Sequence, residues 1–312
     1  MPRLALLIAA ALFTLTPWAS PPLALALGAA LALLVGNPFP VRTAVAARTL
    51  LQTAVVGLGF GMPLGVVLSA GARGLGYTAL GLVAALTLGL GLGRWLRIEQ
   101  RTSVLITAGT SICGASAIAA VGPAIGATAE AMSVSLATIF ILNAVALYLF
   151  PVLGHVLDLS QHQFAVWAAL AIHDTSSVVG AAASFGPAAL GEATVLKLAR
   201  ALWIVPLTIG AAALVQAPLD GESRRRATLP WFVGAFVLAA LTRSLLPPSA
   251  APALDAAVHA ARTALALTLF LIGLGLTRAT LASVGFRPML QGVLLWAALG
   301  TLTLLAVVRW VG

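Results

Sequence analysis

The chain has 312 residues, of which 61% are hydrophobic and only 8% are Asp, Glu, Lys or Arg, and its mean hydropathy is +1.08. Since a soluble domain carries about 25% charged residues, this composition excludes a soluble globular protein and indicates an integral membrane protein. The net charge of +9 does not point to a nucleic-acid partner, because the arginines cluster between apolar runs, as they do in cytoplasmic loops.

Eleven apolar runs approach the length of about 20 residues that a membrane-spanning helix needs. They cover 4–19, 21–36, 47–69, 75–93, 103–126, 131–151, 164–186, 193–215, 229–248, 256–276 and 288–309. The connections are short, which predicts an all-α polytopic membrane protein without a soluble domain. The first run also has the charged start and apolar centre of a signal peptide. Because Pro21-Pro22 leads straight into the next run, an uncleaved first span is favoured.

The distribution of arginines predicts the orientation of the chain. With the N-terminus in the cytoplasm, one side of the membrane holds Arg3, Arg42, Arg48, Arg94, Arg97, Arg101, Arg224, Arg225, Arg226, Arg278 and Arg287. The other side holds chiefly Arg73 and Arg309. This asymmetry follows the positive-inside rule and predicts a cytoplasmic N-terminus and an external C-terminus.

The number of spans allows an inverted repeat. When the first helix (1–20) is set aside, the groups 21–151 and 152–312 hold five spans each, and two successive groups of five must run in opposite directions. The sequence also contains a local similarity, between Ile112-Cys-Gly-Ala-Ser116 and Ile172-His-Asp-Thr-Ser176. It does not fit such a repeat, because the fifth and seventh runs, as complete spans, would be parallel.

The fifth run has a glycine-rich centre, Gly109-Thr-Ser-Ile-Cys-Gly114, with Ser116 following it. A helix broken there would expose N–H groups that can hold an anion and carbonyls that can hold a cation. The alternative is a packing face of small residues, with the hydroxyls of Thr110, Ser111 and Ser116 bonded to the preceding turn.

The seventh run carries His173-Asp174 at its centre, followed by Thr175-Ser176-Ser177. A charged residue at this depth costs roughly 2.5–3.5 kcal/mol, which favours a functional role. On a continuous helix His173 would share a face with Ser176 and Ser177, while Asp174 would point about 100° away. A histidine that titrates near neutral pH would suit proton coupling.

The eighth run contains Lys197, the only lysine in the chain, and Arg200 three residues later on the same helix face. These cations could bind an anionic substrate or neutralise Asp174. Alternatively, both side chains could extend to the membrane interface.

Other chemistries find little support in the sequence. Cys113, His173 and Asp174 suggest a membrane-embedded hydrolase, but an adjacent His and Asp cannot serve one cysteine as base and orienting residue. We therefore expect no enzyme activity. The four histidines lack the spacing of a metal site, and no cofactor motif is present. Asn143 is expected to form a hydrogen bond between helices.

Three motifs in order resemble those of the YeiH-type sulfate exporter family of bacterial membrane proteins. They are Ser111-Ile-Cys-Gly-Ala-Ser-Ala-Ile, His173-Asp174 followed by Val178-Val179, and Lys197-x-x-Arg200 leading to Pro206. Weaker support comes from Gly57-Leu-Gly59-Phe60 and from 269–276. The chain departs from the family where members often have glutamine in place of Ser177, and some have glutamate in place of Asp174.

The resemblance implies two inverted five-helix repeats, similar to those of bile acid:sodium symporters and sodium/proton antiporters, with the fifth and tenth spans broken near the midplane. It also implies a secondary active transporter of the bacterial inner membrane that exports sulfate or a related sulfur oxyanion. We expect Thr110, Ser111, Cys113, Gly114, Ser116, Lys197 and Arg200 to bind substrate, and His173, Asp174, Ser176 and Ser177 to couple transport to an ion.

The expected partners are therefore a small inorganic or organic anion, a proton or sodium ion, and membrane lipid, and a homodimer is compatible with the sequence. The alternatives within transport are a sodium- or proton-coupled importer of an organic anion and an anion channel.

Overall fold

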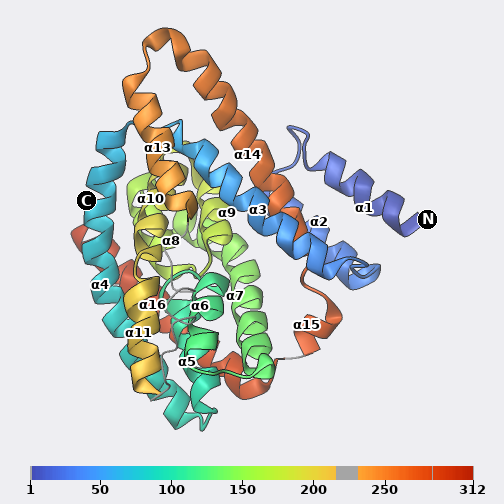
Figure 1. The fold of residues 1–312 in the computed structure, drawn as a ribbon, viewed down its shortest axis with the longest axis vertical. Helices are drawn as coiled ribbons and strands as arrows, with labels where there is room; N and C mark the ends of the chain where they lie inside the picture. The colour runs from blue at the N-terminus through green and yellow to red at the C-terminus, as the bar shows by residue number, and fades with distance from the viewer. Residues whose placement is uncertain (1, 216–230, 283, 312) are drawn as a thin grey trace.

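The computed structural model is helical and describes residues 2–215, 231–282 and 284–311, with no β-strand in these ranges. It confirms the predicted all-α class (Figure 1). The helices are α1 (Pro2–Phe13), α2 (Pro21–Leu34), α3 (Pro40–Gly59), α4 (Leu64–Trp95), α5 (Gln100–Ser111), α6 (Ala115–Ala124), α7 (Ala129–Val156), α8 (Gln161–Ala171), α9 (Thr175–Phe185), α10 (Pro187–Ala201), α11 (Ile204–Leu214), α13 (Trp231–Leu245), α14 (Ala251–Gly273), α15 (Arg278–Ala282) and α16 (Phe286–Trp310).

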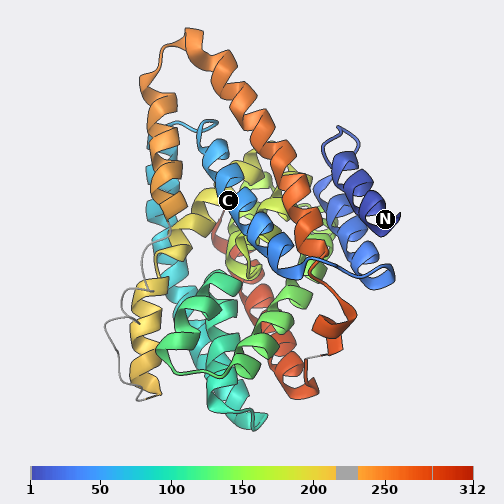
Figure 2. The same cartoon turned by 45° about the vertical axis from the view of Figure 1, so that its right-hand side comes forward.

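Four helices of the described chain are long and apolar enough to cross a membrane: α4, α7, α16, and α14 with the short turn before it. The pair α10 and α11, bent by 40°, can form a fifth crossing. The first two predicted spans are shorter than expected, since α1 has 12 residues and α2 has 14. Figure 2 shows these two helices side by side at the edge of the molecule.

The third and fourth predicted spans have different boundaries in the structure. The chain turns between Gly59 and Leu64, inside the predicted range 47–69, and α4 then continues unbroken for 32 residues. Pro63 precedes the first residue of α4, and a proline there disfavours helical backbone in the residue before it. The turn therefore falls where Gly61 and Pro63 interrupt the apolar run.

The fifth predicted span is a helical hairpin, broken where the glycine-rich centre predicted. α5 ends at Ser111 and α6 begins at Ala115, with Gly114 at a φ of +61°, a backbone conformation that favours glycine. The two outer ends lie together, because Nη1 of Arg101 donates to the carbonyl of Gly126 at 2.7 Å. The segment therefore enters and leaves on the same side instead of crossing the membrane.

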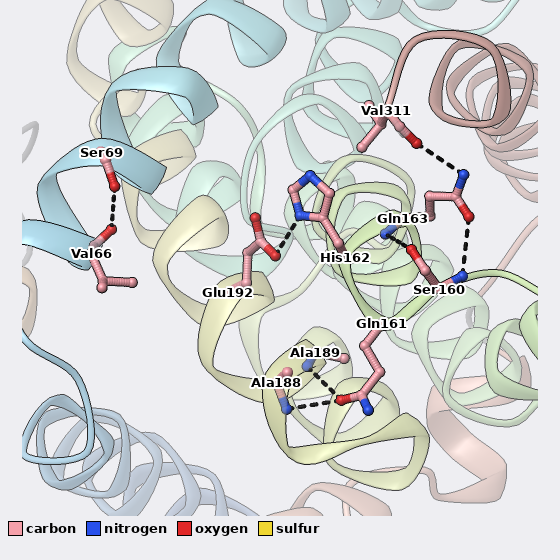
Figure 3. Close-up of polar contacts among 10 residues, drawn as sticks. All are labelled: Val66, Ser69, Ser160, Gln161, His162, Gln163, Ala188, Ala189, Glu192 and Val311. Atoms are coloured by element: carbon pink, nitrogen blue, oxygen red, sulfur yellow. Dashed lines mark hydrogen bonds and ion pairs between the residues drawn. The ribbon is translucent and has the colours of Figure 1, made fainter.

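The seventh predicted span is also a hairpin, so the prediction of a continuous helix through His173 and Asp174 is wrong. α8 ends at Ala171 and α9 begins at Thr175. The rings of Phe164 and Phe185 stack with their centroids 3.8 Å apart, which brings the outer ends of the two arms together. At the same end, the side-chain oxygen of Gln161 accepts hydrogen bonds from the backbone at the start of α10 (Figure 3).

The predicted break in the tenth span is wrong, because α14 runs without interruption from Ala251 to Gly273. The second hairpin is α8–α9 instead. α7, about 42 Å long at 1.5 Å per residue, joins the outer end of α6 to the outer end of α8. The two hairpins therefore enter from opposite ends of the molecule, with α5 and α6 in the lower half of Figure 1 and α8 and α9 in the upper half.

This arrangement changes the interpretation of the sequence similarity between the segments that begin at Ile112 and Ile172. Ile112–Ser116 and Ile172–Ser176 form the tips of the two hairpins. The prediction that both segments are complete, parallel spans is wrong. As hairpins on opposite ends of α7 they are oppositely directed, one in 21–151 and the other in 152–312.

Close helix packing at Gly28 provides a stability test. A Cβ on Gly28 would lie 2.1 Å from the backbone oxygen of Phe270, where α2 crosses α14. We expect Gly28→Ala to lower the free energy of unfolding by about 1–3 kcal/mol, because a backbone atom cannot move aside easily. Gly81→Ala is the matched control, since nothing lies within 4 Å of its Cβ position, and we expect it to be neutral or stabilising by up to about 1 kcal/mol. Thermal unfolding in detergent measures both, and equal effects would contradict the prediction.

Candidate functional site

The tips of the two hairpins meet in the interior. A Cβ on Gly114 would lie 3.3 Å from Cβ and 3.5 Å from Cα of Asp174. Four half-helix ends therefore converge: the carbonyl ends of α5 and α8 and the N–H ends of α6 and α9. Each end carries unpaired backbone groups and a partial charge, and in a membrane these groups must be satisfied within the protein or by a ligand.

Arg200 of α10 binds the carbonyl ends of both hairpins. Its Nε donates to the carbonyl of Ser111 at 2.7 Å, and its Nη1 donates to the carbonyl of Leu170 at 2.5 Å. Weaker contacts reach Thr110 and Ala169 at 3.5 and 3.4 Å. One planar guanidinium, whose rigid fork of donors suits several acceptors at once, thus ties α5 to α8.

Lys197 supports the α8 end in the same way. Its ammonium donates to the carbonyl of Ile172 at 2.7 Å and to that of Ala169 at 3.4 Å. An ammonium has three donors, so these contacts leave one for another acceptor. Both side chains place positive charge beside the negative ends of half-helices, which stabilises them.

The burial of these cations decides between the readings of the eighth run. Lys197 is 0% exposed and Arg200 is 2% exposed, so the interpretation that they extend to the membrane interface is wrong. In the described residues neither cation lies within 4.0 Å of the Asp174 carboxylate. Their hydrogen bonds go to the hairpin tips.

Asp174 caps the N–H end of α9. Its carboxylate accepts hydrogen bonds from the backbone N–H and the hydroxyl of Ser176. Its own backbone N–H donates to the side-chain oxygen of Asn143 at 3.1 Å. This bond from the α9 tip to α7 confirms the interhelical role expected of Asn143.

Asp174 also faces a small cavity of about 10 Å³ between α2, α7, α9 and α14. The polar lining consists of Asn143, Asp174, Ser176 and Ser177, and the rest is apolar: Leu25, Phe140, Ala144, Ile272 and Leu276. Three residues of the predicted ion-coupling set thus share one cavity. Asn143 joins them, which the sequence did not indicate, since its contact with Asp174 depends on how the hairpin is placed.

His173 lies apart from this cavity. It is 1% exposed, and neither of its ring nitrogens has a hydrogen-bond partner within the described ranges. Its ring packs edge-on against Trp296 of α16, with the centroids 6.3 Å apart. The predicted coupling set is therefore divided between two environments.

The N–H end of α6 differs from that of α9, because its N-cap residue is Gly114, which has no side chain that could accept a hydrogen bond. Gly114 is buried at this end, Ala115 is partly buried and Ser116 is exposed. Of the other predicted substrate residues, Thr110, Ser111 and Cys113 are buried within the tip. The hydroxyl of Ser111 donates to the carbonyl of Thr107 at 2.6 Å, whereas that of Thr110 has no partner in the part of the chain described.

The outer ends of the two hairpins carry different charged residues. The outer end of α5–α6 lies near Arg94, Arg97 and Arg101. At the outer end of α8–α9, His162 contacts the carboxylate of Glu192 at 2.7 Å (Figure 3). Arg224, Arg225 and Arg226, which the sequence places with the first group, lie outside the described residues.

Comparison with known proteins gives the family. The family model described as Conserved hypothetical protein 698 matches residues 2–310. The chain belongs to this family. It is 48% identical over 305 residues to the UPF0324 membrane protein Bd1437 of Bdellovibrio bacteriovorus, covering 97% of this chain and 93% of that one. UPF0324 membrane proteins of Bacteroides thetaiotaomicron and Geobacter sulfurreducens are each 46% identical, over 92% and 93% of this chain and 86% and 92% of theirs.

These matches confirm the resemblance to the YeiH-type group and establish a bacterial membrane protein. No solved structure matches the chain.

Proposed function

We propose that this UPF0324 family member is a secondary active transporter that carries a small anion across the bacterial inner membrane. The observation that carries the proposal is the meeting of two oppositely directed hairpins at Gly114 and Asp174. Non-helical backbone at membrane depth is tolerated only inside the protein or around a polar cavity, and transporters place substrate and coupling ions at such broken helices.

The charges at the tips favour an anion. Counted by formal charge, Lys197 and Arg200 contribute +2 and Asp174 contributes −1, which gives the tips a formal charge of +1. The two cations bind the carbonyl ends, so the N–H end of α6, where Gly114 provides no side-chain cap, is the end left for an anionic ligand in this proposal. A helix N-terminus attracts anions through its free N–H groups and its partial positive charge.

In this proposal the substrate binds at Gly114 and Ser116, with Thr110, Ser111 and Cys113 forming the wall behind them. The third N–H of Lys197 and the charge of Arg200 add attraction. Asp174, Ser176 and Ser177 couple transport to a proton or sodium ion, and a coupling role for His173 stays a prediction. Sulfate or a related sulfur oxyanion is the proposed cargo.

The proposed orientation follows the charges of the two ends. The end near Arg94, Arg97 and Arg101 lies in the cytoplasm, as the positive-inside rule requires, together with the N-terminus. The α5–α6 hairpin then enters from the cytoplasm and the α8–α9 hairpin from the outside. Export is the proposed direction, and the gradient of an ion or the membrane potential supplies the energy.

Transport in proteoliposomes tests the proposed function. We expect saturable movement of radiolabelled sulfate that depends on a pH gradient or a membrane potential. Flux of an organic anion in place of sulfate would favour the importer alternative, and flux without saturation would indicate a channel. Failure of every anion tested to move above empty liposomes would contradict transport.

Accessibility of Ser116 gives a second test. We expect Ser116→Cys to react with a membrane-impermeant thiol reagent added at the cytoplasmic side, because Ser116 is exposed in the first turn of α6 and the proposal places substrate there. The unaltered chain is its own control, since Cys113 is only 3% exposed and should stay unlabelled. Mass spectrometry of the labelled protein measures both. If Ser116→Cys stays unlabelled from both sides, no aqueous path reaches this end of α6.

A further inference from the structure

The orientation of the Asn143 amide is fixed by its neighbour. Its side-chain oxygen accepts from the backbone N–H of Asp174 at 3.1 Å, and a backbone N–H can only donate. The oxygen must therefore occupy this position, and the amide cannot be turned round. The NH2 group is left as the free end of the side chain, buried and without a partner among the described residues.

Asn143 lines the same cavity as Asp174, Ser176 and Ser177. A cavity of about 10 Å³ has room for about one water molecule. Water can accept a hydrogen bond from the Asn143 NH2 and donate to the Asp174 carboxylate. The lining of this one small cavity therefore offers both a donor and an acceptor, which is the pairing that a buried water needs.

A bare sodium ion does not fit this lining. Hard cations are bound by several oxygen atoms, whereas the only amide here presents its hydrogens and its oxygen is already engaged. Five of the nine lining residues are apolar: Leu25, Phe140, Ala144, Ile272 and Leu276. The side-chain oxygens that remain are those of Asp174, Ser176 and Ser177, and the Asn143 NH2, which carries partial positive charge, points at the same space.

Among the residues that the structure describes, no second titratable group lines the cavity. α2, α7 and α14 contribute Leu25, Asn143 and Ile272 among others, none of which is titratable. From the elements behind the tip, Lys197 and Arg200 donate to backbone carbonyls, while Cys113 and His173 are buried outside the lining. Within the described ranges, Asp174 is thus the one proton-binding group that faces the cavity.

We infer that Asn143 determines the ion specificity of this site: it holds a water molecule against Asp174, admits a proton to the carboxylate and excludes sodium. The inference deepens the proposed function by naming the proton as the coupling ion. It rests on the proposed function in one respect, since a bound ion is a coupling ion only if the protein is a transporter. The selectivity of the cavity itself does not depend on any substrate.

Binding of radioactive sodium to the purified full-length protein tests this selectivity without substrate. We expect no saturable ²²Na⁺ binding by the unaltered chain. Asn143→Asp replaces the NH2 with a second oxygen while its first oxygen still accepts from Asp174, so we expect this variant to bind ²²Na⁺ in a way that excess NaCl displaces and choline chloride does not. Adding Asp174→Asn to the variant should abolish that binding.

Two results would overturn the inference. One is saturable ²²Na⁺ binding by the unaltered chain that Asp174→Asn abolishes, and this comparison does not need the Asn143 variant to fold. The other is a folded Asn143→Asp protein, monodisperse on size exclusion, that binds no sodium. If no anion is transported in proteoliposomes while the sodium results hold, the proposed transport fails but the selectivity of the cavity stands.

Discussion

Replacing Arg200 with leucine is expected to destabilise the protein strongly, because Arg200 ties the two hairpin tips together. The substitution removes the donors to the carbonyls of Ser111 and Leu170. A buried polar group left without a partner costs about 1–3 kcal/mol, so two of them predict a loss of roughly 2–6 kcal/mol in the free energy of unfolding. Because leucine also removes a buried charge, the orphaned carbonyls, not an unpaired cation, dominate the cost.

The matched control is Arg243→Leu. Arg243 pairs with Asp255 at 2.7 Å, but the Asp255 side chain is 63% exposed, and an exposed ion pair is worth about 0–1 kcal/mol. Thermal unfolding of the detergent-solubilised proteins compares the two variants. A third variant, Arg200→Lys, should recover only part of the stability, because one ammonium cannot reproduce the guanidinium fork that reaches both hairpins. Equal stability of the two leucine variants would show that Arg200 does not hold the tips together.

The sequence located the site better than it located the path of the chain. Gly114 marked the break in the fifth run, because only glycine readily adopts the backbone conformation found there. Lys197 and Arg200, which the sequence also singled out, lie where the tips of the two hairpins meet. A run of about 20 apolar residues, however, has the same hydropathy whether it forms one long helix or two short helices. α8 and α9 have 11 residues each, which together imitate a span of the bilayer.

The second break had a signal that hydropathy does not measure. Asp174 followed by Ser176 and Ser177 is typical of a helix N-cap, and Asp174 does cap α9. A polar pair in an apolar run can therefore mark a helix start as well as a charged point within a helix. The position of Asn143 had no such signal, since its partner depends on α7 lying against the second hairpin.

The cap also separates the structural role of Asp174 from its proposed role in coupling. Asparagine and aspartate are about equally good N-caps, so Asp174→Asn should keep the hydrogen bond from the Ser176 N–H and the fold. It cannot bind or release a proton. We expect this variant to unfold within about 1 kcal/mol of the unaltered protein but to lose sulfate transport driven by a pH gradient. Asp174→Ala, which loses the cap as well, should be less stable by about 0.5–2 kcal/mol.

Two transport assays on the same proteoliposomes distinguish loss of coupling from loss of binding. Gradient-driven transport needs the proton to be carried, whereas exchange of labelled for unlabelled sulfate at equal pH needs only that the substrate site moves between the two sides. If Asp174 couples and Gly114 and Ser116 bind, Asp174→Asn abolishes the first and retains the second. Gradient-driven transport at the full rate by Asp174→Asn would assign Asp174 to capping α9 alone. Loss of both activities in a folded variant would place the carboxylate in substrate binding, at the point where the two hairpin tips meet.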